Sequence, residues 1–398
     1  MDRALFAPDF RIRLDGDPIP AELRGSIQGV RCHTGYDGLD EVEITLANDQ
    51  LRWLDNPRFK LDTSLSLELG YAPNPLVQVF DGEVVARGAS FPAGAAPTFT
   101  VTAHDRRHKM REGKKVRWFA IPLPCPGNLP VPDLATASLV TLENLMLPMF
   151  DPVGAALSII LGGVDTIVAI TDPDSAQKVI RKQANESDYD FLRRIAAENG
   201  WDMLVEHDGA VGGHLLRFTS SLDHLDADFT YAYGRSLIDF SPRVSSVGQI
   251  VTVGGFVWVP AIQMTFNVTL GFDWDRMSLT LAIYPGMVPI NMMPGDYMIE
   301  EPLTPTSIPR KLVSELIPKL NKRLTATGTV VGEPKLRAGN VVRIEGAGEE
   351  FGGLYRVTGL THTLDGGGFR TRFEARKEVW FGSIPLADQG AVPIRVSF

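Results

Sequence analysis

The feature that most constrains the fold is a strict alternation of apolar and polar residues in short stretches near the N-terminus. Val42, Ile44 and Leu46 alternate with polar neighbours, and residues 64–71 and 98–105 repeat the pattern. Because successive side chains of a β-strand point to opposite faces, each stretch predicts a half-buried strand. Turn-forming residues separate the stretches, at positions 15–16, 36–38, 73–75 and 81–82. The pattern predicts a closed or nearly closed antiparallel sheet, with a barrel favoured.

Length and composition indicate a folded protein of several domains. The chain has 398 residues, of which 44% are hydrophobic and 22% charged, and its mean hydropathy is near zero. A chain of this length divides into about two to four domains of ordinary size. These proportions are those of a globular protein and exclude a disordered chain.

The charge and the cysteines narrow the functional class. A net charge of −9 argues against a general nucleic-acid coat, which needs a basic face. The basic run 106–115 is interpreted as a solvated or loop surface. Cys32 and Cys125 lie too far apart in sequence to suggest a disulfide framework, and the start of the chain lacks the apolar segment of a signal peptide. We therefore expect assembly in a reducing cytoplasm.

Residues 183–198 predict an amphipathic helix. Ser187 can cap the first turn, and Asp190, three residues on, completes the acidic variant of a capping box, so the helix should begin near Asp188. The apolar face is formed by Phe191, Leu192, Ile195 and Ala196.

A hairpin is predicted directly after this helix. Asn199-Gly200 supplies a left-handed stop, Trp201 opens an extended run, and Asp208-Gly209 marks a turn before a second run over 214–220. Nothing in the helix or the hairpin has the layout of a nucleophile or a metal site, so the residues alone favour a structural packing unit.

The remaining segments are predicted to be mixed. Residues 119–132 are rich in proline and mark a boundary or an exposed arm, and 134–174 could be helix or buried strand. The apolar run 152–164 is too short to span a membrane and is interpreted as a buried or interface segment. A strand over 247–256 should end in paired glycines.

A long hairpin and a helix are expected next. The alternating runs 262–270 and 277–283 should form the hairpin, with one apolar face. Residues 309–324 have helical spacing that Pro318 should kink or break, and strands return to the C-terminus. The predicted class is mainly β with α (α+β): two antiparallel tube-like β-barrel domains plus intervening mixed α/β subdomains.

Candidates for chemistry are weak. His104 and His108 are spaced as metal ligands on a helix, but the alternation before them predicts a strand running into a loop. The glycine-rich stretch 346–353 lacks the lysine of a phosphate loop and is interpreted as a turn between strands. Asp273 and Asp275 lie in the predicted hairpin turn, where aspartate is expected for turn chemistry. We predict no catalytic residue, no metal site and no cofactor.

Residues 183–203 resemble the most recognisable segment of the phage late control gene D family and its VgrG relatives. The matching residues are Gln183, Glu186, Ser187, Asp188, Tyr189, Phe191, Leu192, Arg194, Gly200 and Trp201. Residues 80–91, 100–110 and 245–256 are similar to further family segments in the family's order. The C-terminal strands resemble the family's last barrel at Gly339, Gly353, Tyr355, Val357, His362, Thr371 and Phe373.

The resemblance covers most of the chain and is weakest from 116 to 171. It implies a baseplate hub of a contractile injection system or phage tail: a homotrimer whose six barrels adapt a trimeric spike to a hexameric tail tube. The implied partners are the spike, a tail tube or tube-initiator protein, other baseplate components, and cargo or tape-measure protein in a lumen that we expect to be polar and acidic. Stable nucleic-acid binding is not expected. The chain ends where VgrG proteins continue, so a separate spike polypeptide is expected.

The predicted boundaries follow from these patterns. They are an N-terminal tube-like barrel (1–115), a proline-rich and mixed subdomain (116–182), a helix-hairpin segment entering the second barrel (183–245), a mixed subdomain with a long hairpin and a helix (246–325), and C-terminal strands completing the second barrel (326–398). The alternative functions are a cell-wall hydrolase associated with the injection machinery and a monomeric carbohydrate-binding β-protein.

Overall fold

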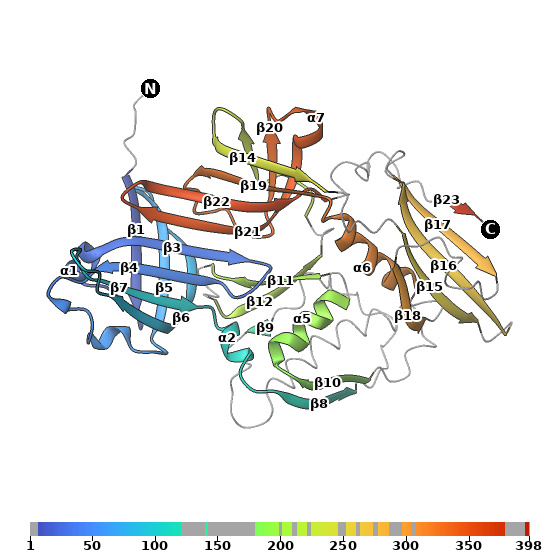
Figure 1. Ribbon diagram of the computed structural model, residues 1–398, viewed down its shortest axis with the longest axis horizontal. Coiled ribbons are helices and arrows are strands. Elements are labelled where there is room, and N and C mark those ends of the chain that lie inside the picture. Colours follow the sequence, from blue (N-terminus) through green and yellow to red (C-terminus); the bar gives the residue numbers. More distant parts are fainter. Residues whose placement is uncertain are drawn as a thin grey trace.

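The computed structural model describes residues 7–120, 140–141, 180–198, 201–208, 213–220, 224–245, 252–259, 263–273, 278–285, 297–303, 308–378 and 395–397. In these residues β-strands dominate and helices are few, which confirms the mainly β prediction (Figure 1). No helix within the described ranges is both long and apolar enough to cross a membrane.

The largest sheet has thirteen strands in two neighbouring blocks. The N-terminal block consists of β1 (Ala7–Leu14), β3 (Ile27–Gly35), β4 (Glu41–Ala47), β5 (Ser64–Ala72), β6 (Val77–Ser90) and β7 (Thr98–His104), with the two-residue β2 (Asp17–Pro18) at its edge. The C-terminal block consists of β13 (Phe229–Ala232), β14 (Leu237–Val244), β19 (Leu324–Val331), β20 (Val341–Glu345), β21 (Gly353–Asp365) and β22 (Gly368–Arg376).

Each block surrounds its own apolar core. In the N-terminal block the alternating residues Val42, Ile44 and Leu46 are buried as the sequence predicts, and Leu23 of α1 (Ala21–Ser26) packs into the same core. In the C-terminal block the second core gathers residues of six strands, among them Tyr231, Leu237, Val330, Ile344, Tyr355 and Phe373. Alternation therefore places one face of each strand inward, at a gain of roughly 25 cal/mol per Å² of apolar surface buried.

The blocks are not separate closed barrels. Strand β3 pairs with β4 on one side and with β21 of the other block on the other, where His33 is opposite Thr361 and Arg31 is opposite Thr363. No pairing within the described residues closes β1 onto β3. The prediction of two closed barrels is thus not confirmed: the edge that would close the first block is used to join it to the second.

The middle of the chain forms smaller sheets and two longer helices. Strand β8 (Lys115–Ala120) pairs with β10 (Ile180–Glu186), and α5 (Asp188–Glu198) leads into the hairpin of β11 (Trp201–Glu206) and β12 (Leu215–Ser220), which β9 (Val140–Thr141) extends. A five-stranded sheet has the order β18-β15-β16-β17-β23. Its strands are β15 (Thr252–Val259), β16 (Met264–Asp273), β17 (Ser278–Pro285), β18 (Tyr297–Leu303) and β23 (Arg395–Ser397), and α6 (Ile308–Leu320) packs on β15 and β16.

The predicted helix at Asp188 and its hairpin are confirmed, as is the long hairpin of β16 and β17. Three details differ. The paired glycines lie inside β15 and not at its end. Both faces of β16 are buried between Asn267 and Phe272, because β16 is a central strand beneath α6. The helix includes Pro318 in its last turn and ends two residues later, so Leu324 belongs to β19.

Two further elements are short helices where loops were expected. α2 (Arg107–Met110) follows β7, and α7 (Gly348–Phe351) lies between β20 and β21. The expected stop at Asn199-Gly200, Cys125, the run 152–164 and Asp275 lie outside the described residues. The five predicted boundaries stay a prediction.

Gly82→Ala should destabilise the N-terminal block by about 1–3 kcal/mol. A Cβ at this position in β6 would collide with the backbone carbonyl of His104 on the neighbouring strand and with the Phe80 ring, 2.7 Å away. Gly88→Ala, on the same strand with open space around its Cβ, is the matched control. Thermal unfolding of both variants tests this, and equal melting temperatures would contradict it.

Candidate functional site

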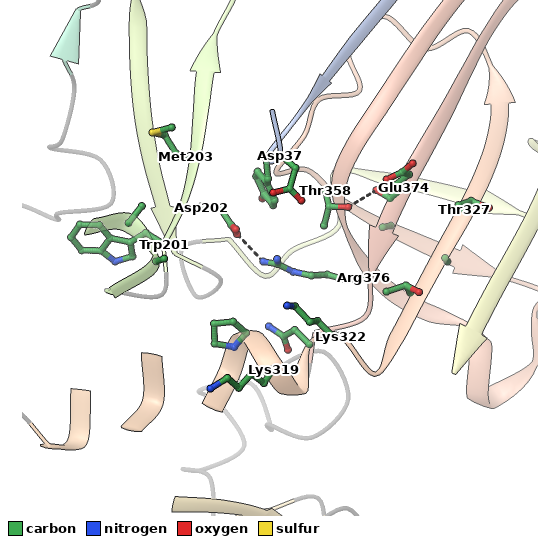
Figure 2. Close-up of a pocket in the computed structure, with 18 of the residues that line it drawn as sticks. Asp37, Trp201, Asp202, Met203, Lys319, Lys322, Thr327, Thr358, Glu374 and Arg376 are labelled. Atoms are coloured by element: carbon green, nitrogen blue, oxygen red, sulfur yellow. Dashed lines mark hydrogen bonds and ion pairs between the residues drawn. The ribbon is translucent and has the colours of Figure 1, made fainter. Parts of the chain in front are cut away.

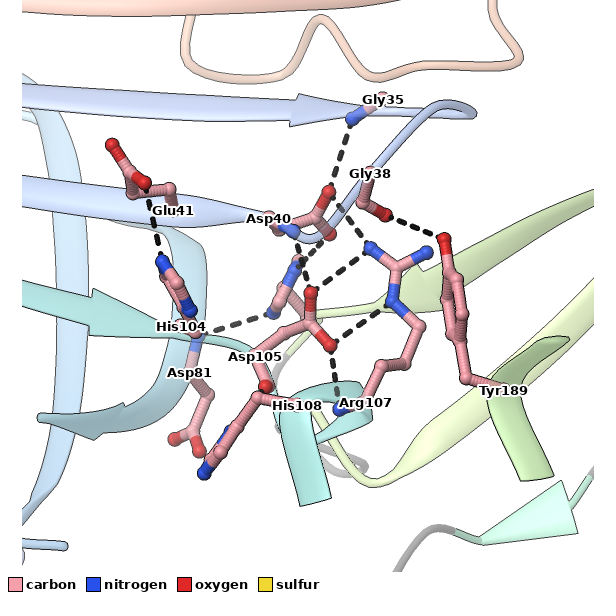
Figure 3. Close-up of polar contacts among 11 residues, drawn as sticks. Gly35, Gly38, Asp40, Glu41, Asp81, His104, Asp105, Arg107, His108 and Tyr189 are labelled. Carbon is pink, nitrogen blue, oxygen red and sulfur yellow. Dashed lines mark hydrogen bonds and ion pairs between the residues drawn. The ribbon is translucent and has the colours of Figure 1, made fainter. Parts of the chain in front are cut away.

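A buried ionic network lies where the N-terminal block meets the middle of the chain (Figure 3). Arg107 of α2 has no exposed side-chain surface, and its Nη2 lies 2.9 Å from Asp105 Oδ2 and 3.1 Å from Asp40 Oδ1. Its Nε also donates to Asp105 Oδ1 at 3.0 Å. Both carboxylates are almost fully buried, so the guanidinium is what makes their burial tolerable.

His207, just after β11, completes the network. The backbone N–H of Asp81 donates to His207 Nδ1 at 3.1 Å, and a backbone amide can only donate. Nδ1 is therefore unprotonated, and Nε2–H donates to Asp40 Oδ2 at 2.8 Å. The ring also stacks on Phe80, with centroids 5.2 Å apart. The N-terminal block thus fixes both the tautomer and the orientation of this imidazole.

Charge balance in the network sets its protonation states. Burial alone would raise the pKa of Asp40, but the charge of Arg107 and the hydrogen bonds from His207 and the Gly35 N–H outweigh it and hold this pKa below its ordinary value. Burial would lower the pKa of Arg107, and Asp105 and Asp40 raise it instead. Asp40 and Arg107 therefore stabilise each other's charged forms, and this ion pair holds the surrounding segments together.

Helix α5 is attached to the same place. Tyr189 Oη donates to the Gly38 carbonyl at 3.1 Å, and the Arg111 guanidinium lies 4.4 Å from the centre of the Tyr189 ring. We call Asp40, Asp105, Arg107, Tyr189 and His207 the Arg107 junction. It joins the turn before β4, α2, α5 and the end of β11.

The family-like residues at the start of α5 make a self-contained turn. Gln183 is fully buried, and its Nε2 donates to the Glu186 carbonyl at 3.1 Å and to Asp188 Oδ1 at 2.9 Å. Ser187 Oγ accepts from the Asp190 N–H at 3.1 Å and donates to Asp190 Oδ2 at 2.7 Å, which confirms the predicted cap. In the standard capping box the acidic side chain reaches the backbone N–H of the cap residue, whereas here it binds the cap hydroxyl.

The other residues of this motif either pack in the apolar core beside α5 or form contacts that hold the start of the helix. Phe191 and Leu192 are fully buried in the core shared by α5 and the β11–β12 hairpin. Arg194 Nη2 pairs with Glu186 at 2.7 Å while its guanidinium lies over the Phe191 ring. Trp201 packs against that core from β11, and Gly200 lies outside the described residues.

The C-terminal motif residues sit far from α5 in the sequence and support β21. Gly339 and Gly353 both adopt positive φ, and a Cβ on Gly339 would lie 3.3 Å from Leu204 of β11. Tyr355 is fully buried and donates to the Phe351 carbonyl at 2.7 Å. The structure therefore brings Gly339 close to the β11 hairpin but leaves Tyr355 inside the second core.

His362 lies where the two blocks join. The register places Thr371, His362, Cys32, Val42 and Ala103 in one buried row that crosses from β22 to β7. His362 Nδ1 is 2.9 Å from Thr371 Oγ1. Burial, and then the charge of Arg337, lower the pKa of His362 to about 3. The imidazole is neutral at physiological pH and acts as a packed core residue.

The opposite face of the joined sheet is polar across both blocks. One row of register partners consists of Thr329, Arg372, Thr361, His33, Glu41 and His104, and the next contains Arg370, Thr363, Arg31, Glu43 and Thr102. A hollow of about 450 Å³ lies on this face where the blocks meet. We call it the polar sheet face. It carries charges of both signs.

A larger groove of about 1070 Å³ lies between α5, β11, α6 and the C-terminal block (Figure 2). Arg376 of β22 donates to Asp202 of β11 at 2.7 Å across it. Arg193 pairs with Asp37 at 2.9 Å, and Lys319 pairs with Glu315 within α6. These pairs tie segments to one another and form no convergent pair of titratable groups.

The basic run 106–115 is a solvated loop surface, as predicted, only over residues 111–114, and the prediction is wrong for its other basic residues. Arg107 is buried, Arg106 pairs with Asp81, Lys109 with Glu83, and Lys115 with Asp188. The only signal of this arrangement in the sequence was the aspartate followed by basic residues and a histidine in the family-like segment 100–110. Asp40 is 65 residues away from its partner Asp105, and His207 is 167 residues away from its partner Asp40. No local pattern in the sequence marks Asp40 or His207.

Solved structures with a similar fold are described as tail proteins or as a secretion-system component. A tail protein of Neisseria meningitidis and the 43 kDa tail protein of prophage MuSo2 of Shewanella oneidensis each match with a TM-score of 0.55 over 93% of this chain, covering 97% and 98% of theirs at 10% and 11% identity. An Escherichia coli component of the type VI secretion system matches with a TM-score of 0.51 at 11% identity, over 94% of this chain and 79% of its own. The chain therefore has a tail-protein fold.

Comparison of the sequence with models of protein families identifies one match. A family model described as the Alg8 N-terminal domain matches residues 159–366. This range begins before β10 and ends in the turn between β21 and β22, so it excludes the N-terminal block. No curated protein matches the sequence significantly.

Arg107→Met should lower the free energy of unfolding by about 3–5 kcal/mol, because it leaves Asp40 and Asp105 buried without a counter-ion. Arg87→Met, at an exposed position of β6, is the matched control and should change stability by less than about 0.5 kcal/mol. Urea unfolding of both purified variants measures the difference. Equal unfolding midpoints would show that the junction does not hold the N-terminal block, α5 and β11 together.

Acid should destabilise the protein through His362. Because the pKa of His362 is about 3 in the fold and near 6.5 when unfolded, the unfolded chain binds the extra proton between these values, and stability is lost as pH falls below about 6.5. Between pH 7 and pH 5 the protonation of His362 in the unfolded chain lowers the free energy of unfolding by about 2 kcal/mol. His362→Phe should remove that loss, whereas His224→Phe, at a half-exposed site, should keep it. A pH dependence that is unchanged in His362→Phe would contradict the assignment.

Proposed function

The chain belongs to the Alg8 N-terminal domain family, and from its fold we propose that it is a structural hub in a phage tail or a related contractile injection machine. In this proposal it is a homotrimer that adapts a trimeric spike to a hexameric tail tube. The proposed role is the one that the resemblance to the late control gene D family and its VgrG relatives implies. The protein then has a structural role: it is assembled in the bacterial cytoplasm and becomes part of a phage tail or injection particle.

One observation carries the proposal. The thirteen-stranded sheet divides into two blocks of six strands each, with β2 as the remaining strand, and the blocks lie side by side through β3 and β21. Three copies of such a chain present six comparable blocks. A ring of six blocks built from three chains has three-fold symmetry toward a spike and approximate six-fold symmetry toward a tube.

The outer edges of the sheet support assembly with other copies. Within the described residues β14 pairs with β19, forms one further isolated bridge between Leu237 and Tyr233, and ends the strand order opposite to β1 and β2. Near this edge Ile238 is 55% exposed, Tyr233 66% and Val331 60%. Unpaired strand edges with apolar side chains invite pairing with another chain. We assign this edge to contacts between protomers.

The polar sheet face is assigned to the lumen. Threonines and charged groups of both signs follow each other across both blocks, so translocating protein or DNA would meet a wall without an apolar stripe. The face carries Arg31, Arg370 and Arg372 against Glu41 and Glu43, so it is polar with mixed charge and differs from the acidic lumen expected from the sequence. Cargo or tape-measure protein would pass this wall, and the tube and baseplate components would meet its rims.

An enzymatic function, as a cell-wall hydrolase associated with the injection machinery, is the competing proposal. It needs a carboxylate or another group free to act on a substrate. The buried carboxylates Asp40 and Asp105 are held by Arg107, and Asp202 in the groove is held by Arg376 of β22. The structural proposal therefore has the better support.

The test is the solution mass by light scattering at several concentrations. We expect three times the 43.6 kDa chain. Ile238→Glu should shift the protein toward monomer while its circular dichroism spectrum stays that of the folded chain, because it places a charge on the proposed contact edge. Leu61→Glu, at an equally exposed site in the other block, should leave the trimer intact. A strict monomer that stays monomeric when a trimeric spike protein is added would overturn the proposal.

A further inference from the structure

Three possible metal ligands from different segments converge beside α2. Asp62 precedes β5, Glu83 lies on β6, and His108 lies on α2, and one ligand atom from each comes within 4.8 Å of the others. Glu83 and His108 are largely buried, whereas Asp62 is exposed. One imidazole nitrogen and two carboxylates form a mixed N/O donor set, which suits divalent transition metals.

The tautomer of His108 favours ligation. Its Nδ1 lies 2.8 Å from the Asp105 backbone carbonyl, and a carbonyl can only accept, so Nδ1 carries the proton. Nε2 then has a free lone pair, and it lies 3.8 Å from Glu83 Oε2. Donation of one ring N–H to a backbone carbonyl, with the other nitrogen left as ligand, is how metal-binding histidines are commonly held.

Glu83 presents the second donor. The residue is 8% exposed, and its Oε2 is buried without a hydrogen bond in the described structure. The Lys109 ammonium donates to Oε1 at 2.6 Å and lies 2.5 Å from Oε2, so it neutralises the carboxylate without giving Oε2 a well-directed hydrogen bond. The position between Glu83 and its neighbours therefore already attracts a cation.

The Lys109 side chain can move away from Glu83, whereas Arg106 is held in place. Its side chain is 26% exposed, so the ammonium can move to water when another cation arrives. Arg106 is held by Asp81 at 2.8 Å and reaches Glu83 at 3.8 Å, which leaves it a secondary partner of that carboxylate. A divalent ion would pair with both carboxylates at once, whereas Lys109 supplies one charge to Glu83.

We propose that Asp62, Glu83 and His108 bind a divalent transition-metal cation, such as Zn²⁺ or Mn²⁺, in exchange for the Lys109 ammonium. The ion would link the loop before β5, strand β6 and helix α2 at the side of the Arg107 junction. This site is independent of the hub assignment, because it requires neither a trimer nor a partner protein.

The experiment titrates the full-length protein with Co²⁺ and Zn²⁺ and follows the Co²⁺ absorption spectrum and the heat of Zn²⁺ binding. We expect one ion per chain, a d–d band without thiolate charge transfer, and a higher melting temperature with metal. Lys109→Gln should tighten binding at least about tenfold by removing the competing charge. His108→Gln and Asp62→Asn should each weaken binding by about tenfold or more.

His104→Gln is the matched control, because His104 lies four residues earlier and contacts Glu41 at 3.2 Å outside the cluster. Its binding should equal that of the unaltered chain. Circular dichroism and gel filtration confirm folding of each variant. Absence of saturable binding in both the unaltered chain and Lys109→Gln would overturn the proposal. Binding that persists in His108→Gln, or that is lost in His104→Gln, would place the metal elsewhere and overturn it as well.

Discussion

The rest of the structure depends on a single guanidinium buried between two carboxylates. Arg107 neutralises Asp40 and Asp105, and without it neither carboxylate could remain ionised at nearly zero exposure. Once it is in place, Asp40 can accept from His207 and from the Gly35 N–H, so the turn before β4 is fixed to the end of β11. The relative position of the first block and the middle of the chain follows from this one charge.

A second constraint acts on β3, the strand that precedes the turn before β4. Strand β3 cannot both close its own block and pair with β21, and it pairs with β21. This choice creates a buried row from Thr371 to Ala103 that belongs to neither core alone, and it explains a neutral histidine at its middle. Two separate barrels would leave His362 at an edge, whereas the joined sheet removes it from water.

Local patterns in the sequence predicted local structure well and distant contacts poorly. Alternation around Ile44 and the cap at Ser187 depend on neighbours within a few residues, and both predictions are confirmed. The paired glycines of β15 and the two buried faces of β16 were missed because a central strand beneath α6 has no exposed face to alternate. The Arg107 junction was missed for a different reason. Its members come from four separate segments, and charged residues in sequence look the same whether they will be solvated or paired.

The family-like segment at α5 shows how a motif rich in polar residues can serve structure alone. It contains several polar residues in twelve positions, yet Gln183 binds Asp188, Glu186 binds Arg194, and Ser187 binds Asp190. Three side chains reach outward: the Tyr189 hydroxyl binds the Gly38 carbonyl, Asp188 pairs with Lys115 of β8, and Arg193 pairs with Asp37. The apolar face of the helix packs against the β11–β12 hairpin. A helix start that is braced by its own polar contacts therefore holds the N-terminal block, β8 and the β11–β12 hairpin at a fixed mutual position.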